Sequence, residues 1–187
     1  MIDDVDVSSS TLRLLASQTL KTWSNHGVFN LLSDEDYVVR TLAARELHTR
    51  CGKEIFDKLV TLASSDSDFM REICAFALGQ FGTPKMPYKN ETIPVLLNLI
   101  TDVSAEVRAA SAAALGHICF DGMPREVENA LYVAVSDADK DVRCCVASSL
   151  GNASKKQETI DALNKLLQDP EKEVQEYAEL GKDILTG

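Results

Sequence analysis

Glycine, proline and histidine are scarce in this sequence. Its 187 residues include 9 Gly, 5 Pro, 3 His and 1 Trp, whereas 45% of the residues are apolar and 26% are charged. So little glycine and proline excludes collagen-like chains and low-complexity disordered chains. So few histidines leave little material for metal binding or acid–base catalysis. We therefore expect one folded domain with no catalytic residues, no metal site and no cofactor.

Long apolar runs and positive charge are also lacking. No stretch approaches the roughly 18 apolar residues of a membrane span, and the first residues lack the features of a signal peptide. The net charge of −10, from 19 basic and 29 acidic side chains, disfavours nucleic acid as a partner, because neutralising phosphates requires a basic surface. We expect a soluble cytoplasmic protein that contacts neither membrane nor nucleic acid and prefers partners with basic surfaces.

The cysteines form no Cys-x-x-Cys pair and lie in apolar segments. They are odd in number and comprise Cys51, Cys74, Cys119, Cys144 and Cys145. This pattern predicts reduced thiols in the core of a cytosolic protein. Because Cys144 and Cys145 are adjacent, they cannot both face a core, and we expect one of them to be half exposed.

The sequence repeats one pattern along its length. A clear copy runs from Asp137 through Val142-Arg143 to Leu150-Gly151. The arginines at this position are Arg40, Arg71, Arg108 and Arg143, separated by 31, 37 and 35 residues. In the second copy the acidic residue is displaced by one position, to Ser65-Asp66, and a fifth, degraded copy has Gln175 in place of the arginine. Internal repeats of this length are typical of solenoids.

Each copy of the pattern predicts two helices. Apolar residues around the arginine recur with a period of 3.6, which predicts an amphipathic second helix. Its start is indicated by a capping residue four positions before the arginine, namely Asp36, Ser67, Ser104 and Asp139, and in the last copy by Asp169-Pro170. Leu-Gly pairs ending at Gly79, Gly116 and Gly151 indicate helix C-termini. The shorter first helices are expected at 28–32, 53–63, 92–100, 125–135 and 157–167.

A single helical hairpin of this size cannot bury both apolar faces, so the hairpins must stack. The expected fold is an all-α α-solenoid of about five helical hairpins, with an amphipathic N-terminal helix at 11–23 that covers the open end. The boundaries we expect are a cap at 1–24 and repeats at 25–51, 52–82, 90–119, 123–153 and 155–187.

The frame Asp-x-x-x-x-Val-Arg, followed by small residues and Leu-Gly, resembles the HEAT repeat of the short, phycobilisome-lyase-like type over roughly residues 25 to 185. The segment from Asp68 to Gln80 is also similar to a repeat of bacterial HEAT proteins linked to Rhs-type polymorphic toxins, which are immunity proteins. The resemblance implies a non-enzymatic, protein-binding scaffold. One form of this hypothesis is an immunity protein that neutralises a basic toxin domain. The alternatives are a lyase-like helper that binds a cofactor or chromophore, and a general assembly factor.

Acidic residues six positions before an arginine suggest a structural ladder rather than catalysis. Each arginine can bridge to the acid of its own turn or to neighbouring carbonyl groups, and stacking would repeat this bond along the solenoid. The ladder residues are Asp34, Arg40, Arg71, Asp102, Arg108, Asp137 and Arg143.

The expected binding surface lies on the second helices, one, five and nine positions after each arginine. In solenoids this face lines the concave groove. The candidate residues are Thr41, Arg45, Glu72, Phe76, Gln80, Ala109, His117, Cys144, Ser148 and Asn152. Phe76 is either a binding anchor or a core residue. The long connection at 82–90, with Lys85, Met86 and Tyr88, is a second candidate for partner contact.

One metal site is worth testing, because His48, Cys51, His117 and Cys119 together supply two nitrogen and two sulfur ligands. The first two belong to the first repeat and the other two to the third. A whole repeat would separate the two halves, so we expect no zinc site.

Overall fold

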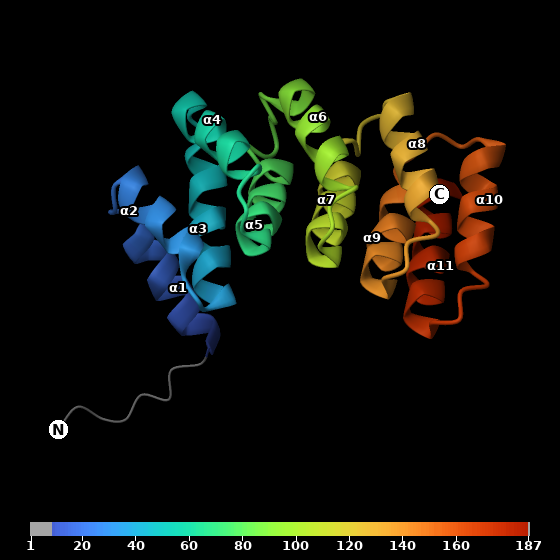
Figure 1. Ribbon diagram of the computed structural model, residues 1–187, viewed down its shortest axis with the longest axis horizontal. Coiled ribbons are helices and arrows are strands. Elements are labelled where there is room, and N and C mark those ends of the chain that lie inside the picture. Colours follow the sequence, from blue (N-terminus) through green and yellow to red (C-terminus); the bar gives the residue numbers. More distant parts are fainter. Residues whose placement is uncertain (1–8, 187) are drawn as a thin grey trace.

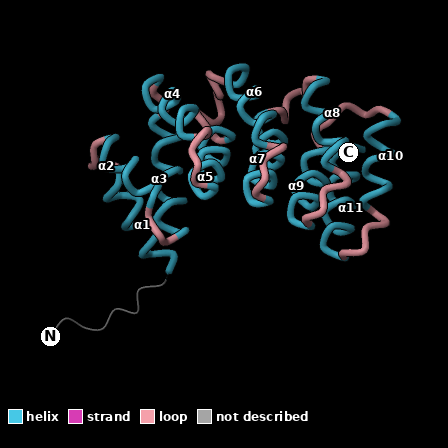
Figure 2. The backbone as a smooth tube through the Cα atoms, in the orientation of Figure 1, coloured by secondary structure: helices cyan, strands magenta, loops and turns pink. Residues whose placement is uncertain are grey.

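The computed structural model describes residues 9–186, and within this range it contains helices and connecting segments but no strand (Figures 1 and 2). The helices are α1 (Ser9–Leu20), α2 (Asn25–Asn30), the short 3-10 helix η1 (Leu31–Ser33), α3 (Tyr37–Arg50), α4 (Lys53–Leu62), α5 (Asp68–Gly79), α6 (Lys89–Leu99), α7 (Ala105–Ile118), α8 (Arg125–Ala134), α9 (Lys140–Leu150), α10 (Gln157–Leu166) and α11 (Lys172–Thr186). The expected all-α fold is confirmed.

The helices form two curved layers. Helices α3, α5, α7, α9 and α11 pack consecutively against one another and form the inner layer, whereas α4, α6, α8 and α10 cover them from outside (Figure 1). Helix α1 packs on α3 at the N-terminal end of the stack. This is the α-solenoid that the repeat predicted, in which each hairpin buries its apolar faces against its neighbours.

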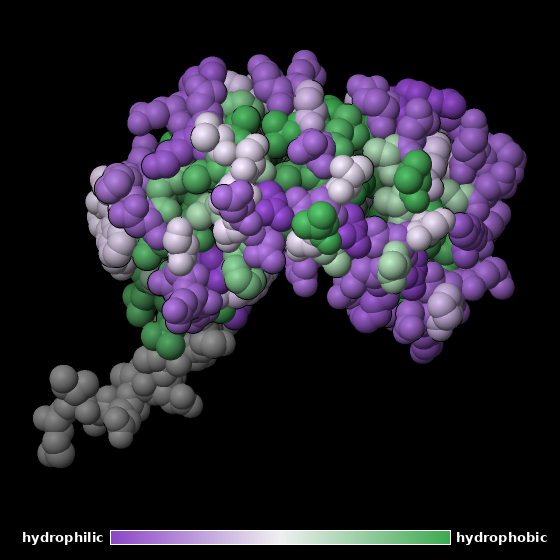
Figure 3. Space-filling model, viewed as in Figure 1, coloured by the Kyte–Doolittle hydropathy of each residue, from purple (hydrophilic) through white to green (hydrophobic). Residues whose placement is uncertain are grey.

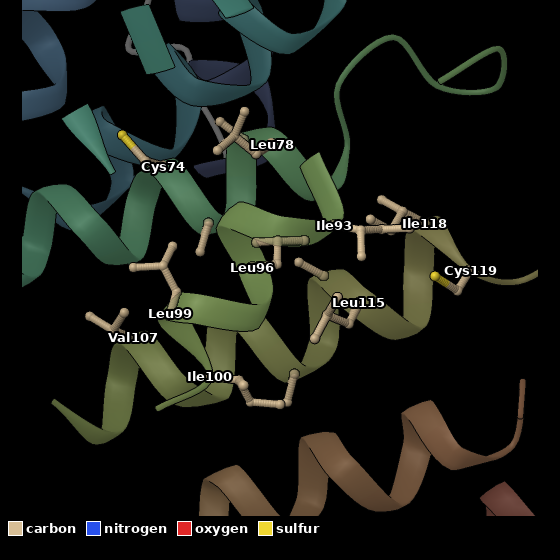
Figure 4. Close-up of a cluster of buried hydrophobic side chains, with 14 of the residues drawn as sticks. Cys74, Leu78, Ile93, Leu96, Leu99, Ile100, Val107, Leu115, Ile118 and Cys119 are labelled. Atoms are coloured by element: carbon tan, nitrogen blue, oxygen red, sulfur yellow. The ribbon is translucent and has the colours of Figure 1, made fainter. Parts of the chain in front are cut away.

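Leucines fill the space between the two layers. Leu78 of α5, Leu96 of α6 and Leu115 of α7 are each at most 1% exposed and point toward the same interior region (Figure 4). Cys74 and Cys119 lie in the same core, and burial raises the pKa of the Cys74 thiol to about 12. The cysteines within residues 9–186 are free, and Cys145 is half-buried while Cys144 is buried, as the adjacency of the two residues predicted.

The capping residues predicted for four inner helices are confirmed. Asp36, Ser67, Ser104 and Asp139 precede α3, α5, α7 and α9, and each accepts a hydrogen bond from a backbone N–H of the first turn. The start predicted for the last helix was wrong. Helix α11 begins at Lys172, so Pro170 lies before the helix rather than at its first position.

Two of the three Leu-Gly pairs end a helix as expected, since Gly79 is the last residue of α5 and Gly151 is the C-cap of α9. Gly116 lies inside α7, not at its end, and a Cβ atom there would lie 2.2 Å from the Ser149 Oγ of α9. Similarly, a Cβ atom on Gly79 of α5 would lie 2.4 Å from that of Ala114 in α7. The missing side chains let neighbouring inner helices approach closely, which explains these glycines without a left-handed helix end.

The connection between α5 and α6 is held against the core by aromatic residues. Met86 is buried, and the Tyr88 ring stacks on Phe56 with the ring centroids 4.5 Å apart. Of the three residues proposed for partner contact in this connection, only Lys85 is fully exposed. Met86 therefore packs inside the protein, whereas contact of Lys85 and the half-buried Tyr88 with a partner stays a prediction.

The two ends of the solenoid have different surfaces. Leu12, Leu14 and Leu15 of α1 are each more than half exposed, and apolar surface is visible at this end in Figure 3. Helices α10 and α11 are mostly hydrophilic in the same view. Within residues 9–186, every helix is too short or too polar to cross a lipid bilayer.

Candidate functional site

A ladder of arginine–aspartate pairs runs along the turns between the two layers. Each arginine donates from Nε and Nη2 to both oxygens of one carboxylate at 2.7 to 2.9 Å, in the pairs Arg71–Asp102, Arg108–Asp137 and Arg143–Asp169. The Nη1 atom of each arginine donates to two backbone carbonyl groups of its own repeat, such as those of Asp102 and Val103 for Arg108. One guanidinium thus joins two consecutive repeats.

This connectivity corrects the pairing expected from the spacing of six. Asp102 supplies its backbone carbonyl group to Arg108 of its own repeat, whereas its carboxylate binds Arg71 of the preceding repeat. Asp169 is a further ladder residue that the arginine spacing did not predict, although it stands six positions before Gln175. The Gln175 amide keeps the carbonyl contact, donating to the Asp169 oxygen at 2.6 Å.

The ladder carboxylates are held in their charged form. Hydrogen bonds from Arg71, Arg108 and Arg143 hold the pKa values of Asp102, Asp137 and Asp169 below their ordinary value, against an opposing effect of burial. These side chains are only 8% to 12% exposed. Charge-assisted, bidentate hydrogen bonds of this kind are strong, so the ladder links consecutive repeats firmly.

The first position of the ladder is incomplete. Arg40 donates from Nη1 to the carbonyl groups of Asp34 and Glu35 at 2.8 and 2.9 Å, as the other arginines do. Its expected carboxylate partner in the next repeat is replaced by Ser65, and within residues 9–186 no carboxylate forms an ion pair with Arg40. The Asp34 carboxylate accepts a hydrogen bond from the Asp36 N–H and does not bind Arg40.

The inner layer carries three hollows that share lining residues. One of about 580 Å³ lies over α3 and α5, one of about 340 Å³ over α5 and α7, and one of about 540 Å³ over α7, α9 and α11. Phe76 belongs to the first two hollows, and Gln80 belongs to the first and third. Because these hollows share lining residues, we call them together the inner groove. The helices that line it form the inner layer of the arch in Figure 1.

The structure brings nearly all the predicted surface residues together in this groove. Those that line it are Arg45, Glu72, Phe76, Gln80, Ala109, His117, Cys144, Ser148 and Asn152. Thr41 does not line any of the three hollows, and its hydroxyl group donates to the Tyr37 carbonyl group at 2.9 Å. Phe76 is half-buried, packing against the core while lining two hollows, and its role as a binding anchor stays a prediction.

Carboxylates surround the middle hollow. Its lining includes Glu72, Glu106, Asp139 and Asp141 and contains neither lysine nor arginine. Burial raises the pKa of Glu72, and the nearby Glu106 adds to that rise, while Arg40 opposes it. Burial and the neighbouring acidic groups therefore outweigh the effect of Arg40 on the Glu72 carboxylate.

The sequence analysis did not identify the acidic side of the groove. Glu106, Asp141 and Glu173 each stand two positions before the arginine, or before Gln175 in the last repeat. In an α-helix, the position two before the arginine lies about one turn before the position one after it, on the same face. The same helix face, followed one turn further toward the N-terminus, therefore includes Glu106, Asp141 and Glu173. Tyr177 of α11, 40% exposed, also lines the groove.

Two histidines lie beside Gln80 in the groove. The His48 Nδ1 and His117 Nε2 atoms are buried without a hydrogen-bond partner. Burial lowers the pKa of His48, with further lowering from Arg45 and His117, so the neutral ring is favoured. Across residues 9–186, no group of three or more His, Cys, Asp or Glu side chains is arranged to hold a metal ion.

Comparison with known families identifies the repeat. Residues 26–116 and 93–180 match the family model of HEAT repeats. The chain therefore belongs to the HEAT-repeat family, a class of helical scaffold proteins whose surfaces bind other proteins.

Individual proteins share this architecture. Protein YibA of Escherichia coli strain K12 is 29% identical over 168 residues, which cover 88% of this chain and 59% of YibA. The X-ray structure of YibA matches with a TM-score of 0.81 at 23% identity, over 97% of this chain and 65% of that chain. This chain thus spans about three fifths of the length of its curated relative YibA.

Two further solved structures share the fold. The complex of CpcE and CpcF of phycocyanin lyase from Nostoc sp. PCC7120 matches with a TM-score of 0.67 at 19% identity, over 84% of this chain and 97% of that chain. A designed armadillo repeat protein in complex with the peptide (KR)4 matches with a TM-score of 0.58 at 19% identity, over 94% and 92% of the two chains. At such low identity these matches establish the fold alone.

Proposed function

We propose that this protein acts by binding, without catalysis, and that its inner groove holds a segment of a partner protein that carries lysine or arginine side chains. The observation that carries the proposal is the middle hollow, whose lining combines Ala109, Ala110 and Ala113 with the carboxylates of Glu72, Glu106, Asp139 and Asp141. Asp141 is paired with Lys140, and Asp139 caps α9, so Glu72 and Glu106 are the carboxylates without a basic partner. The small alanine side chains leave room for a long side chain, and the carboxylates can accept its hydrogen bonds. The likeness to a designed armadillo protein in complex with (KR)4 supports the same kind of ligand.

The partner we favour is a basic toxin domain, which the protein would neutralise by covering its surface. The resemblance of residues 68–80 to repeats of toxin-linked immunity proteins supports this assignment, and the net charge of −10 supports a basic partner. A lyase-like helper that binds a chromophore is the alternative, favoured by the fold of the CpcE and CpcF complex. Incubation with a tetrapyrrole distinguishes the two, since only the helper would change its absorption spectrum.

The groove can be tested with a fluorescent (Lys-Arg)4 peptide and a matched pair of variants. Glu106 and Glu126 are both exposed glutamates in the first turn of a helix, but only Glu106 lines the inner groove. We expect Glu106→Lys to weaken peptide binding by about tenfold or more, because it places a like charge beside the ligand. Glu126→Lys changes the net charge equally and is expected to weaken binding by less than about twofold, since that charge is distant and screened by salt.

Fluorescence anisotropy at physiological ionic strength measures both affinities. An equal loss in the two variants would show that only net charge matters, and would contradict a specific groove. An acidic peptide of the same length should not bind. If the basic peptide itself does not bind to the unaltered protein, the proposal is wrong.

A further inference from the structure

The incomplete first ladder position creates a site of its own. Arg40 is 7% exposed, yet its Nε and Nη2 atoms form no hydrogen bond with another described residue, while Nη1 is held by two carbonyl groups. Arg71, Arg108 and Arg143 use the same two atoms to bind both oxygens of a carboxylate. The Nε and Nη2 atoms of Arg40 can therefore bind a carboxylate, and no side chain of residues 9–186 occupies them.

Ser65 stands where the missing carboxylate would be. Its carbonyl group accepts from Arg71 Nη1, as the Asp102 carbonyl group accepts from Arg108. Its hydroxyl group accepts from the Ser67 N–H at 3.2 Å, just as the Asp102 carboxylate accepts from the Ser104 N–H at 2.9 Å. Ser65 thus keeps the turn that aspartate forms elsewhere but provides no carboxylate to the arginine of the preceding repeat.

The space that an aspartate would fill is open. A hollow of about 520 Å³ is lined by Arg40, by Ser65 and Ser67 of the following turn, and by Phe69. The Phe69 ring centroid lies 5.0 Å from the Arg40 guanidinium carbon, and that of Tyr37 lies 5.7 Å from it. Cation–π contacts and the two carbonyl groups hold the guanidinium in place, so a ligand would meet a preorganised site.

We propose that this hollow, the Arg40 pocket, binds a carboxylate group of a partner molecule, which completes the first position of the ladder from outside. A planar carboxylate matches the two donor atoms, as it does at the three complete positions. A phosphate dianion fits less well, because Asp34 and Glu35 also line the hollow and repel a second negative charge. The Arg40 pocket is a different hollow from the inner groove, although the charge of Arg40 also acts on Glu72 of that groove.

The site can be observed directly by NMR through the Arg40 Nε–H resonance. That resonance is identified by its loss in Arg40→Gln, a change that copies Gln175 at the same position of the last repeat. Should this variant fail to fold, assignment through the side chain of the unaltered protein identifies the signal. Sodium acetate is titrated against sodium chloride at constant ionic strength. We expect a saturable shift of the Arg40 signal with acetate only.

Two variants place a new carboxylate in the same hollow. In Ser65→Asp, the new carboxylate would accept hydrogen bonds from Arg40 Nε and Nη2. We therefore expect this variant to weaken acetate binding by about tenfold or more. Ser67→Asp adds equal charge but would cap α5, as Asp36 caps α3, so binding should weaken by at most about threefold. No acetate-specific shift in the unaltered protein, or an unchanged affinity in Ser65→Asp, would overturn the proposal.

Three further probes identify the source of the carboxylate. One tripeptide carries an Asp side chain between blocked termini, a second has only a free C-terminal carboxylate, and the third probe is inorganic phosphate. Saturation by either peptide supports the site and shows which carboxylate it accepts. Tighter binding of phosphate than of acetate would overturn the assignment to a carboxylate.

Discussion

Arg40 and Arg108 occupy the same position in two repeats but have different surroundings. Both donate from Nη1 to two carbonyl groups of their own turn, so this contact depends only on the local chain. Only Arg108 also binds a carboxylate, because Asp137 belongs to the next repeat and Arg40 meets Ser65 instead. The carbonyl contacts of the arginine are therefore determined within one repeat, whereas its ion pair requires an aspartate from the next repeat.

The largest difference should appear when carboxylates at the two kinds of position are removed. Asp137→Ala leaves Arg108 partly buried without its partner, and we expect it to lower the free energy of unfolding by about 3 kcal/mol. The matched change Asp34→Ala removes the hydrogen bond from the Asp36 N–H but no ion pair within the described chain. We expect it to lower the free energy of unfolding by about 1 kcal/mol. Urea unfolding of both variants measures the difference, and equal costs would show that the ladder contributes only through its turns.

Glycine substitutions should separate the two regions next. Gly116→Ala forces α7 and α9 apart, because the new methyl group meets the Ser149 side chain, and we expect a loss of about 2 kcal/mol. A Cβ atom on Gly27 of α2 would have its nearest neighbour, an atom of the Trp23 ring, at 3.4 Å. Gly27→Ala should therefore be neutral or stabilising by about 0.5 kcal/mol, as helix propensity predicts. Thermal unfolding compares the two, and a tolerated Gly116→Ala would contradict close helix approach as the reason for that glycine.

The sequence predicted the fold well because the register of the repeat survives in every copy. The arginine, the preceding capping residue and the apolar period of 3.6 together located most helices within a few residues of their observed ends. The ladder connectivity was not predictable in the same way. A spacing of six suggests a local pair, but the long arginine side chain reaches an aspartate 26 to 31 positions further along the chain.

The candidate groove was predicted only in part, because a periodic pattern gives the residues of a helix face but not the extent of the hollow above it. Helical periodicity identified its central residues, such as Phe76 and Gln80, but not how far the hollow extends toward the helix N-termini, where Glu106 and Asp141 lie. Nor does the sequence pattern alone show that Met86 is buried or that the Tyr88 ring stacks on Phe56, because residues of a long connection can face either the core or solvent.

Acid should weaken the three complete ladder positions and leave the first one unaffected. The folded pKa values of Asp102, Asp137 and Asp169 lie below the ordinary 3.8, so the unfolded chain binds more protons in acid. Their contribution is fully present above the ordinary value and is lost as the pH falls through the lower folded values. We expect the free energy of unfolding to decline steeply below pH about 4. The decline should be shallower in Asp137→Ala, and an identical pH profile in that variant would contradict this origin.

The smallest effect should come from completing the first position. Ser65→Asp provides the carboxylate that Arg40 lacks, in a turn whose hydrogen bonding already matches that of Asp102 and Asp137. We expect a gain of only about 1 kcal/mol, because an added pair must offset desolvation and Arg40 already has two aromatic neighbours. Ser67→Asp, with the same added charge, should change stability by less than about 0.5 kcal/mol, since Ser and Asp cap helices similarly well. Equal stability of the two variants would mean that the new carboxylate adds nothing to the contacts of Arg40 with Phe69 and Tyr37. Aromatic contact would then stabilise the first repeat in place of the ion pair found in the others.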